Sequence, residues 1–133
     1  MKNKGIWIDK EKAHIVTVLE KDTKMVTILA EDNVEQSFEV ERPGGAQEII
    51  KDRKVLEREK LRINSFIKSL VPKLKDTKNI LVLGPSMMCQ KFAKVLGNNY
   101  PIIGAKIKEV RKADKMTENQ LKALVKDYFS PLG

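Results

Sequence analysis

The sequence contains little cysteine and little histidine. Its single cysteine, Cys89, excludes an internal disulfide and any cysteine-based zinc cluster, and a reducing, intracellular setting is the simplest interpretation. We expect Cys89 to be a buried packing residue, because no histidine or second cysteine lies near it in the sequence. The one histidine, His14, lies among β-branched residues with no serine or cysteine motif nearby. We therefore expect His14 to be structural or on the surface rather than a general base.

Long apolar runs are also absent. No stretch approaches the roughly 20 apolar residues that a membrane helix needs, and residues 1–9 lack the apolar core of a signal peptide. We therefore expect a soluble, cytoplasmic protein. The sequence has no internal repeat or low-complexity tract, and Trp7, Tyr100 and Tyr128 are too scattered to form a base-stacking platform.

Signatures of a nucleotide cofactor are weak. The run Leu83-Gly84-Pro85-Ser86 ahead of a predicted helix is neither Gly-x-Gly-x-x-Gly nor a P-loop. Pro85 also removes one of the backbone N–H donors that would hold an anion there. We expect no cofactor.

Positive charge is in excess. The 133 residues include 26 Lys and Arg against 18 Asp and Glu, a formal charge of +8, and the excess is concentrated after Lys51. The length suffices for one domain with its own core. The charge makes a polyanionic partner plausible, and RNA, DNA or an anionic membrane surface fit equally well on charge alone.

The hydrophobic pattern predicts a strand meander followed by helical crossovers. The predicted strands are Gly5 to Asp9, Ala13 to Glu20, Met25 to Ala30, Val34 to Val40, Asn79 to Leu83 and Ala105 to Val110. The predicted helices are Glu48 to Val71, Met87 to Leu96 with Ser86 as N-cap and Gly97 as its end, and a last helix opened by a Thr117–Gln120 capping box that buries Leu121, Leu124, Val125 and Phe129. This order predicts a single α/β domain, a ribonuclease H-like mixed sheet with helices packed on it.

Asp9 ends the first predicted strand, where a ribonuclease H-like nuclease keeps its first metal carboxylate. Glu39, Glu41 and Asp114 are the possible partners, but nothing in their spacing demands a site for two metal ions. We expect no metal, and Asp9 to be a turn residue.

The long predicted helix changes character along its length. An apolar stripe in its second half should dock on the core, and comprises Ile63, Phe66, Ile67, Leu70 and Val71. Its first half is mostly charged, so we expect a solvated stalk that holds Pro43-Gly44-Gly45-Ala46-Gln47 away from the body. The two glycines allow close backbone approach to another surface, and Gln47 offers an amide with donors and an acceptor.

The run Arg42 to Gln47, the charged helix after it and Ile80-Leu81-Val82-Leu83-Gly84-Pro85 resemble the middle domain of the archaeal and eukaryotic peptide-chain release factors and of their relative Pelota. In release factors a Gly-Gly-Gln loop sits at the peptidyl-transferase centre and helps water attack the peptidyl-tRNA ester. Pelota keeps the domain without that triplet and acts on stalled ribosomes. The resemblance implies a stand-alone, single-domain relative, with Gly44 and Gly45 at the glycine positions and Gln47 near that of the glutamine.

The resemblance implies contact with ribosome or tRNA more than hydrolysis. Ala46 separates the glycines from Gln47, and one inserted residue moves the next side chain by up to about 3.5 Å. A catalytic group misplaced by about 1 Å can already lower the rate on the order of a hundredfold. We therefore expect a non-enzymatic, translation-associated protein whose contacting tip is Gly44, Gly45 and Gln47. Basic residues of the stalk would hold RNA phosphates: Lys51, Arg53, Lys54, Arg58 and Arg62.

Other interpretations remain open at this point. Gln47 is a candidate catalytic residue that positions water for peptidyl-tRNA hydrolysis, or the glycine pair is an ordinary turn before a helix. The charges of the stalk also fit i,i+4 pairing on a solvated helix. Exposed Ile49, Val55 and Leu56 would suit a dimer seam. A second basic cluster is either a solubility feature or a further RNA contact, and comprises Lys106, Lys108, Arg111, Lys112 and Lys115.

Overall fold

The computed structural model describes residues 2–30 and 48–130, with the side chains of the second range described from residue 57 onward. Within this part of the chain, one mixed sheet runs in the order β3-β2-β1-β4-β5. Its strands are β1 (Lys2–Ile8), β2 (Lys12–Val18), β3 (Thr23–Leu29), β4 (Thr77–Gly84) and β5 (Ile107–Lys112). The first three form an antiparallel meander, whereas β1, β4 and β5 run parallel to one another. The predicted strand Val34 to Val40 lies outside the described residues.

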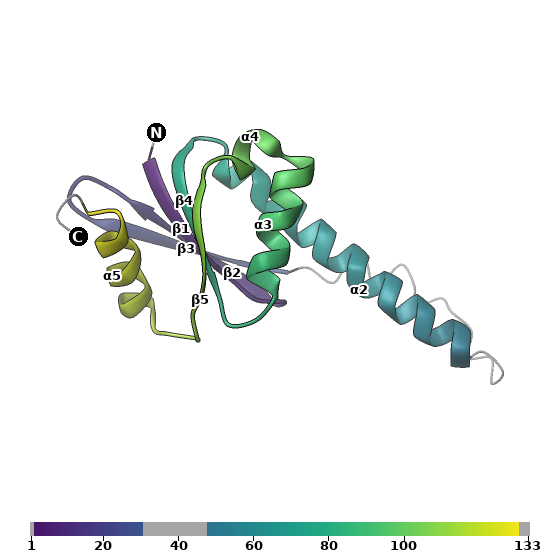
Figure 1. The fold of residues 1–133 in the computed structure, drawn as a ribbon. Coiled ribbons are helices and arrows are strands. Elements are labelled where there is room, and N and C mark those ends of the chain that lie inside the picture. Colours follow the sequence, from purple (N-terminus) through teal and green to yellow (C-terminus); the bar gives the residue numbers. More distant parts are fainter. Residues whose placement is uncertain (1, 31–47, 131–133) are drawn as a thin grey trace.

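Helices cover both faces of the sheet (Figure 1). The long helix α2 (Glu48–Leu70) and the 3-10 turn η2 (Val71–Leu74) lead from the meander into β4, and α3 (Met88–Asn99) with the short α4 (Pro101–Gly104) leads from β4 into β5. The last helix, α5 (Glu118–Tyr128), packs on the opposite face. The predicted class, a mixed α/β fold with helices packed on a sheet, is confirmed.

Each face of the sheet has its own hydrophobic core, because side chains alternate along every strand. On the face of α2 and α3, Ile6 and Ile8 of β1 pack with the buried stripe of α2 and with Phe92 of α3. On the opposite face, Trp7 of β1 packs with Leu121 and Val125 of α5. The central strand β1 therefore contributes alternate residues to both cores.

The turn between β1 and β2 is held by Asp9. Its carboxylate Oδ1 accepts hydrogen bonds from the backbone N–H groups of Glu11 and Lys12, each at 2.8 Å. The backbone N–H of Asp9 donates in turn to the Lys12 carbonyl at 3.0 Å. Asp9 is thus a turn residue, as the sequence predicts.

The boundaries of α3 differ from those predicted. The helix continues through Gly97 to Asn99, and the Tyr100 N–H still donates to the Leu96 carbonyl at 2.9 Å. It ends because Tyr100 precedes Pro101 and is pushed out of the helical region, to φ −136° and ψ 63°. Ser86 is not the N-cap either. Met87 holds that position, and the Ser86 Oγ only accepts a long 3.4 Å bond from the Met88 N–H.

Strand β5 starts two residues later than predicted, since the sequence analysis missed α4. The N–H of Ala105 donates to the Pro101 carbonyl, and that of Lys106 to the Ile103 carbonyl, both at 2.9 Å. These bonds keep residues 105 and 106 in a helical turn, so the strand begins at Ile107.

The predicted capping box of α5 is present. The Gln120 N–H donates to Thr117 Oγ1 at 3.2 Å, and the Thr117 N–H donates to Gln120 Oε1 at 2.9 Å. Leu121 and Val125 are buried, whereas Leu124 and Phe129 are only partly buried against the same core.

Candidate functional site

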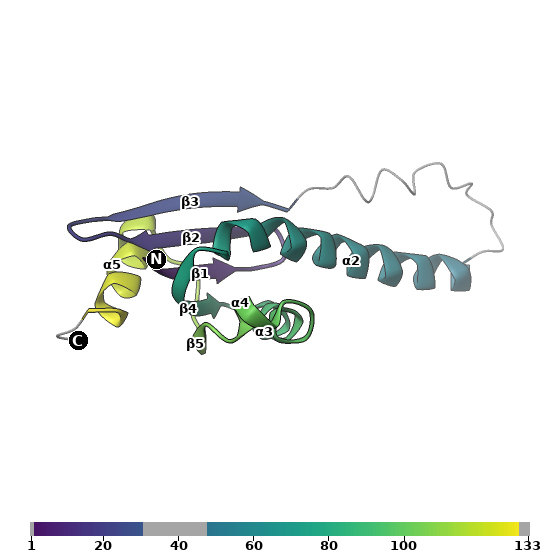
Figure 2. The same cartoon turned by 90° about the horizontal axis from the view of Figure 1, so that it is seen from above.

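Helix α2 projects beyond the sheet, as Figures 1 and 2 both show. Its 23 residues span about 35 Å at the usual helical rise. The predicted apolar stripe is buried in full: Ile63, Phe66, Ile67, Leu70 and Val71. Further out, Glu57, Lys60 and Leu61 are exposed to solvent. The helix is therefore anchored by its inner half and extends outward with its outer half, which we call the stalk (residues 48–62).

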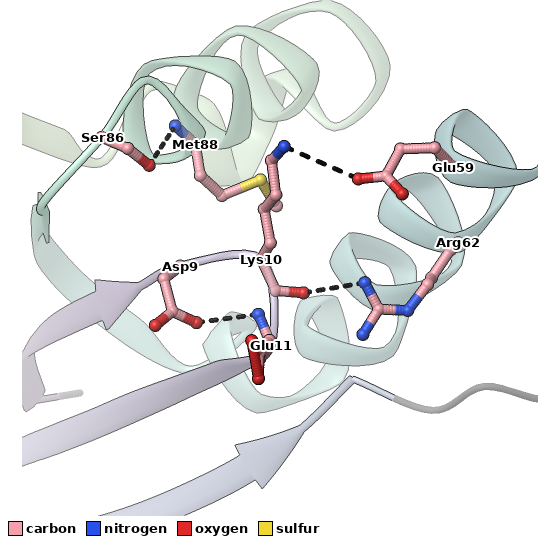
Figure 3. A network of polar contacts seen from close by, with 7 residues as sticks. All are labelled: Asp9, Lys10, Glu11, Glu59, Arg62, Ser86 and Met88. Atoms are coloured by element: carbon pink, nitrogen blue, oxygen red, sulfur yellow. Dashed lines mark hydrogen bonds and ion pairs between the residues drawn. The ribbon is translucent and has the colours of Figure 1, made fainter. Parts of the chain in front are cut away.

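Polar contacts join the base of the stalk to the turn between β1 and β2 (Figure 3). Lys10 Nζ lies 3.7 Å from Glu59 Oε1, and Arg62 Nη1 donates to the Lys10 carbonyl at 3.2 Å. The Lys10 and Glu59 side chains are largely in solvent, so this ion pair contributes at most about 1 kcal/mol. The packing of the inner half of α2 therefore holds the stalk, and these contacts add to its orientation.

The residues predicted to contact RNA fall into three groups. Gly44, Gly45 and Gln47 lie outside the described residues. Lys51, Arg53 and Lys54 belong to the outer turns of α2, where the backbone alone is described. Arg58 and Arg62 lie nearer the body and are half-buried, and Arg62 uses one of its donors on the turn between β1 and β2.

The second basic cluster of the sequence is divided between the two ends of β5. Lys106 precedes the strand and Lys112 ends it, so about 20 Å separates them. Arg111 Nε lies 3.1 Å from Glu109 Oε2, and its guanidinium lies 5.5 Å from the centre of the Tyr128 ring. The hydrogen bond from Arg111 lowers the pKa of the Glu109 carboxyl. Arg111 thus takes part in a local contact, which reduces its availability for a phosphate.

His14 and Cys89, which were considered for catalysis, both make contacts that stabilise the fold. His14 Nδ1 lies 2.8 Å from Thr27 Oγ1, and its ring lies 5.5 Å from that of Trp7, centre to centre. The Cys89 thiol is buried, as expected, and donates to the Ser86 carbonyl at 3.2 Å. Burial raises the pKa of this thiol. Among residues 2–30 and 48–130, no group of three or more metal-binding side chains comes together around Asp9 or elsewhere.

Sequence reasoning missed one concentration of charge. Lysines from three separate stretches of the chain lie at the end of the sheet where the parallel strands begin. We call them the amino-end lysines, and they are Lys2, Lys4, Lys73, Lys75, Lys78 and Lys106. No local motif marks them, because only the parallel pairing of β1, β4 and β5 brings them to one edge.

Solved structures of Pelota and of an archaeal translation termination factor share this fold. Pelota from Archaeoglobus fulgidus matches 96% of the chain at 12% identity and a TM-score of 0.61, over 31% of its own length. Pelota from Thermoplasma acidophilum matches 91% of the chain at 13% identity and a TM-score of 0.53, over 30% of its length. The archaeal translation termination factor aRF1 matches 98% of the chain at 16% identity and a TM-score of 0.55, over 35% of its length.

The fold is that of one part of Pelota and aRF1. The predicted resemblance to release factors and Pelota is therefore confirmed in three dimensions. The chain spans about a third of the length of these proteins. No protein-family model matches the sequence, and no curated protein matches it either. None of the helices in the described ranges has the length and apolar character needed to cross a bilayer.

Proposed function

We propose that this chain is a translation-associated, cytoplasmic protein that binds the ribosome or ribosome-bound tRNA through Gly44, Gly45 and Gln47 and through the basic residues of the stalk. The observation that carries this proposal is the outward projection of α2 (Figure 2). Gln47 directly precedes Glu48, the residue at which α2 begins, on the side away from the sheet. The likeness of the fold to Pelota and aRF1 favours a partner in translation.

The charge of the stalk supports an RNA partner. Lys51, Arg53 and Lys54 lie within the first two turns of α2, at the end of the helix that projects beyond the sheet. Contacts to phosphates require only lysine or arginine on an accessible surface, and they become weaker as salt rises because counterions are released on binding. Salt-sensitive binding is therefore the expected behaviour.

The first experiment is co-sedimentation with ribosomes at low and high salt. We expect binding at low salt that is lost at high salt. A stalk variant (Lys51→Gln, Arg53→Gln and Lys54→Gln) should bind at least about tenfold more weakly. The matched control removes the same charge from exposed lysines of α3 and α5, with Lys91→Gln, Lys94→Gln and Lys126→Gln, and should bind as the wild type does. Absence of binding at both salt concentrations would overturn the proposal.

The second experiment tests whether the chain is an enzyme. We propose a non-enzymatic role because Ala46 separates the glycine pair from Gln47. Peptide release from peptidyl-tRNA on ribosomes should stay at background with the wild type and with Gln47→Ala. Release above background that disappears with Gln47→Ala would show instead that Gln47 positions water for hydrolysis.

A further inference from the structure

The amino-end lysines form a concentrated positive surface. Lys2 and Lys4 belong to β1, Lys73 to η2, and Lys78 to β4. Lys75 follows η2, and Lys106 precedes β5. Asp76 lies among these six lysines, and the group as a whole keeps a formal excess of +5. Lys73, Lys75 and Lys78 are close together in the sequence, whereas Lys2, Lys4 and Lys106 join them only in the folded chain.

Two of these lysines hold the backbone of the edge in place. Lys4 Nζ donates to the Lys73 carbonyl at 2.7 Å, and Lys106 Nζ donates to the Lys75 carbonyl at 3.0 Å. The pKa of Lys4 is lowered, first by burial and then by the charges of Lys2 and Lys73, while Asp76 acts in the opposite direction. Lys2 and Lys73 are therefore close enough to Lys4 for their positive charges to act on it.

An open depression of about 340 Å³ adjoins these charges. Its polar lining residues are Lys4, Thr17, Lys73 and Asp76, and its apolar ones are Ile15, Val26 and Pro72. Val26 on the edge strand β3 remains 47% exposed. The depression thus places apolar side chains beside Lys4 and Lys73, with Asp76 also in its lining.

This surface lies at the far end of the molecule from the stalk. The strands β1 and β4 point toward the side from which α2 projects, and their first residues lie at the other end of the sheet (Figure 2). The inner half of α2 and the length of the sheet therefore separate the stalk from the amino-end lysines.

We propose that the amino-end lysines form a second RNA-binding surface. This surface contacts RNA phosphates at the end of the molecule opposite the stalk. The proposal rests on the proposed function, since it takes the partner to be the same large RNA assembly. Two contacts on one molecule strengthen each other, because binding at one makes the other intramolecular. A structured RNA wide enough to reach both ends would be held in a fixed direction relative to the sheet.

The test removes charge from the exposed members of the surface and measures binding to total tRNA. The amino-end variant carries Lys73→Gln, Lys75→Gln and Lys78→Gln, and leaves Lys4 and Lys106 to hold the backbone. We expect binding about 10- to 100-fold weaker at low salt, and a slope of log K against log salt that is less steep by about 2 to 3, one unit or slightly less per lost phosphate contact. The control variant with Lys91→Gln, Lys94→Gln and Lys126→Gln has the same net charge and should bind within about threefold of the wild type.

Any of three other outcomes would overturn the inference that the amino-end lysines bind RNA. Equal loss in both triple variants would show that net charge alone governs binding. Unchanged binding of the amino-end variant, with weaker binding of the stalk variant, would remove the second surface and leave the proposed function standing. A parallel loss of binding to polyglutamate would show that the surface takes acidic polypeptides rather than RNA. Urea unfolding of every variant checks that the fold is intact.

Discussion

Gly5 in β1 lies directly against Val125 in α5. A Cβ atom at position 5 would lie 2.5 Å from Val125 Cγ2 and 2.9 Å from Cγ1, closer than carbon atoms approach in folded proteins. Glycine is thus required at this place for packing, because it lets the helix rest on the backbone of the strand. The contact sets the distance between α5 and the central strand of the sheet.

Substituting Gly5→Ala should destabilise the protein by about 1–3 kcal/mol, the usual cost of overpacking a core, because the stiff valine side chain has little room to turn away. Urea unfolding measures the change. The cost should fall by at least about 1 kcal/mol in a Val125→Ala background, since the two residues are in contact. Gly97→Ala in α3 is the control substitution.

No atom lies within 4 Å of the place that a Cβ atom at position 97 would occupy, so alanine there should stabilise the helix by up to about 1 kcal/mol. Equal losses at positions 5 and 97 would contradict this account.

The capping box of α5 leads to a second prediction. Thr117→Ala removes the oxygen that accepts from the Gln120 N–H, and should lower the free energy of unfolding by about 0.5–2 kcal/mol. Asn119→Ala changes an exposed residue of the same first turn that caps nothing, and should alter stability by less than about 0.5 kcal/mol. The same loss at both positions would show that the cap does not hold this helix start.

The single histidine should titrate below its ordinary pKa of 6.5. Burial lowers the pKa of His14, the neighbouring Lys12 charge lowers it further, and Asp9 and Glu118 act in the opposite direction. The unfolded chain therefore binds more protons between the folded-state pKa and 6.5, so stability should rise with pH through that window and level off above it. An NMR titration of the imidazole gives the pKa. Lys12→Gln should move it upward, while Lys68→Gln on α2 should leave it in place. A midpoint above 6.5 would refute the prediction.

Cys89 should react slowly with thiol reagents in the native protein. Its side chain is 1% exposed, and burial raises the pKa of the thiol, so both access and the thiolate fraction are reduced. The rate of reaction with Ellman's reagent should be at least about tenfold lower in the native state than in the urea-unfolded chain. Glutathione under both conditions corrects for the effect of urea on the reagent. Equal corrected rates would mean that α3 opens readily at its first turn.

The parts of the fold that follow from local pattern could be predicted from the sequence. The short apolar and β-branched runs of β1 and β2, the apolar stripe of α2 and the capping box of α5 each involve residues within a few positions of one another. The predicted end of α3 at Gly97 was wrong because Pro101, four residues further on, decides where the helix stops. The short helix α4 was missed because its four residues carry no periodicity.

The two candidate binding surfaces also differ in whether the sequence predicts them. The stalk could be predicted because its charged and apolar halves are consecutive in the sequence. The amino-end lysines could not, because they become neighbours only when β1, β4 and β5 pair in parallel. The bond between Lys4 and the Lys73 carbonyl joins residues 69 positions apart, and no window of sequence contains both. The basic cluster around Lys106 and Lys112 shows the reverse, since residues close in sequence were separated by the length of a strand.

Among the side chains described from residue 57 onward, those that anchor α2 in the core all belong to its inner half, so the length of the outer half can change independently. The described core takes side chains from this helix only from Ile63 inward. Inserting seven residues before Lys60 would add two turns and move Glu48 outward by about 10 Å with the hydrophobic cores untouched. The distance that the helix extends from the sheet and the stability of the hydrophobic cores thus depend on different stretches of α2. Changes in the length of the outer stretch can alter that distance without lowering the stability of the cores.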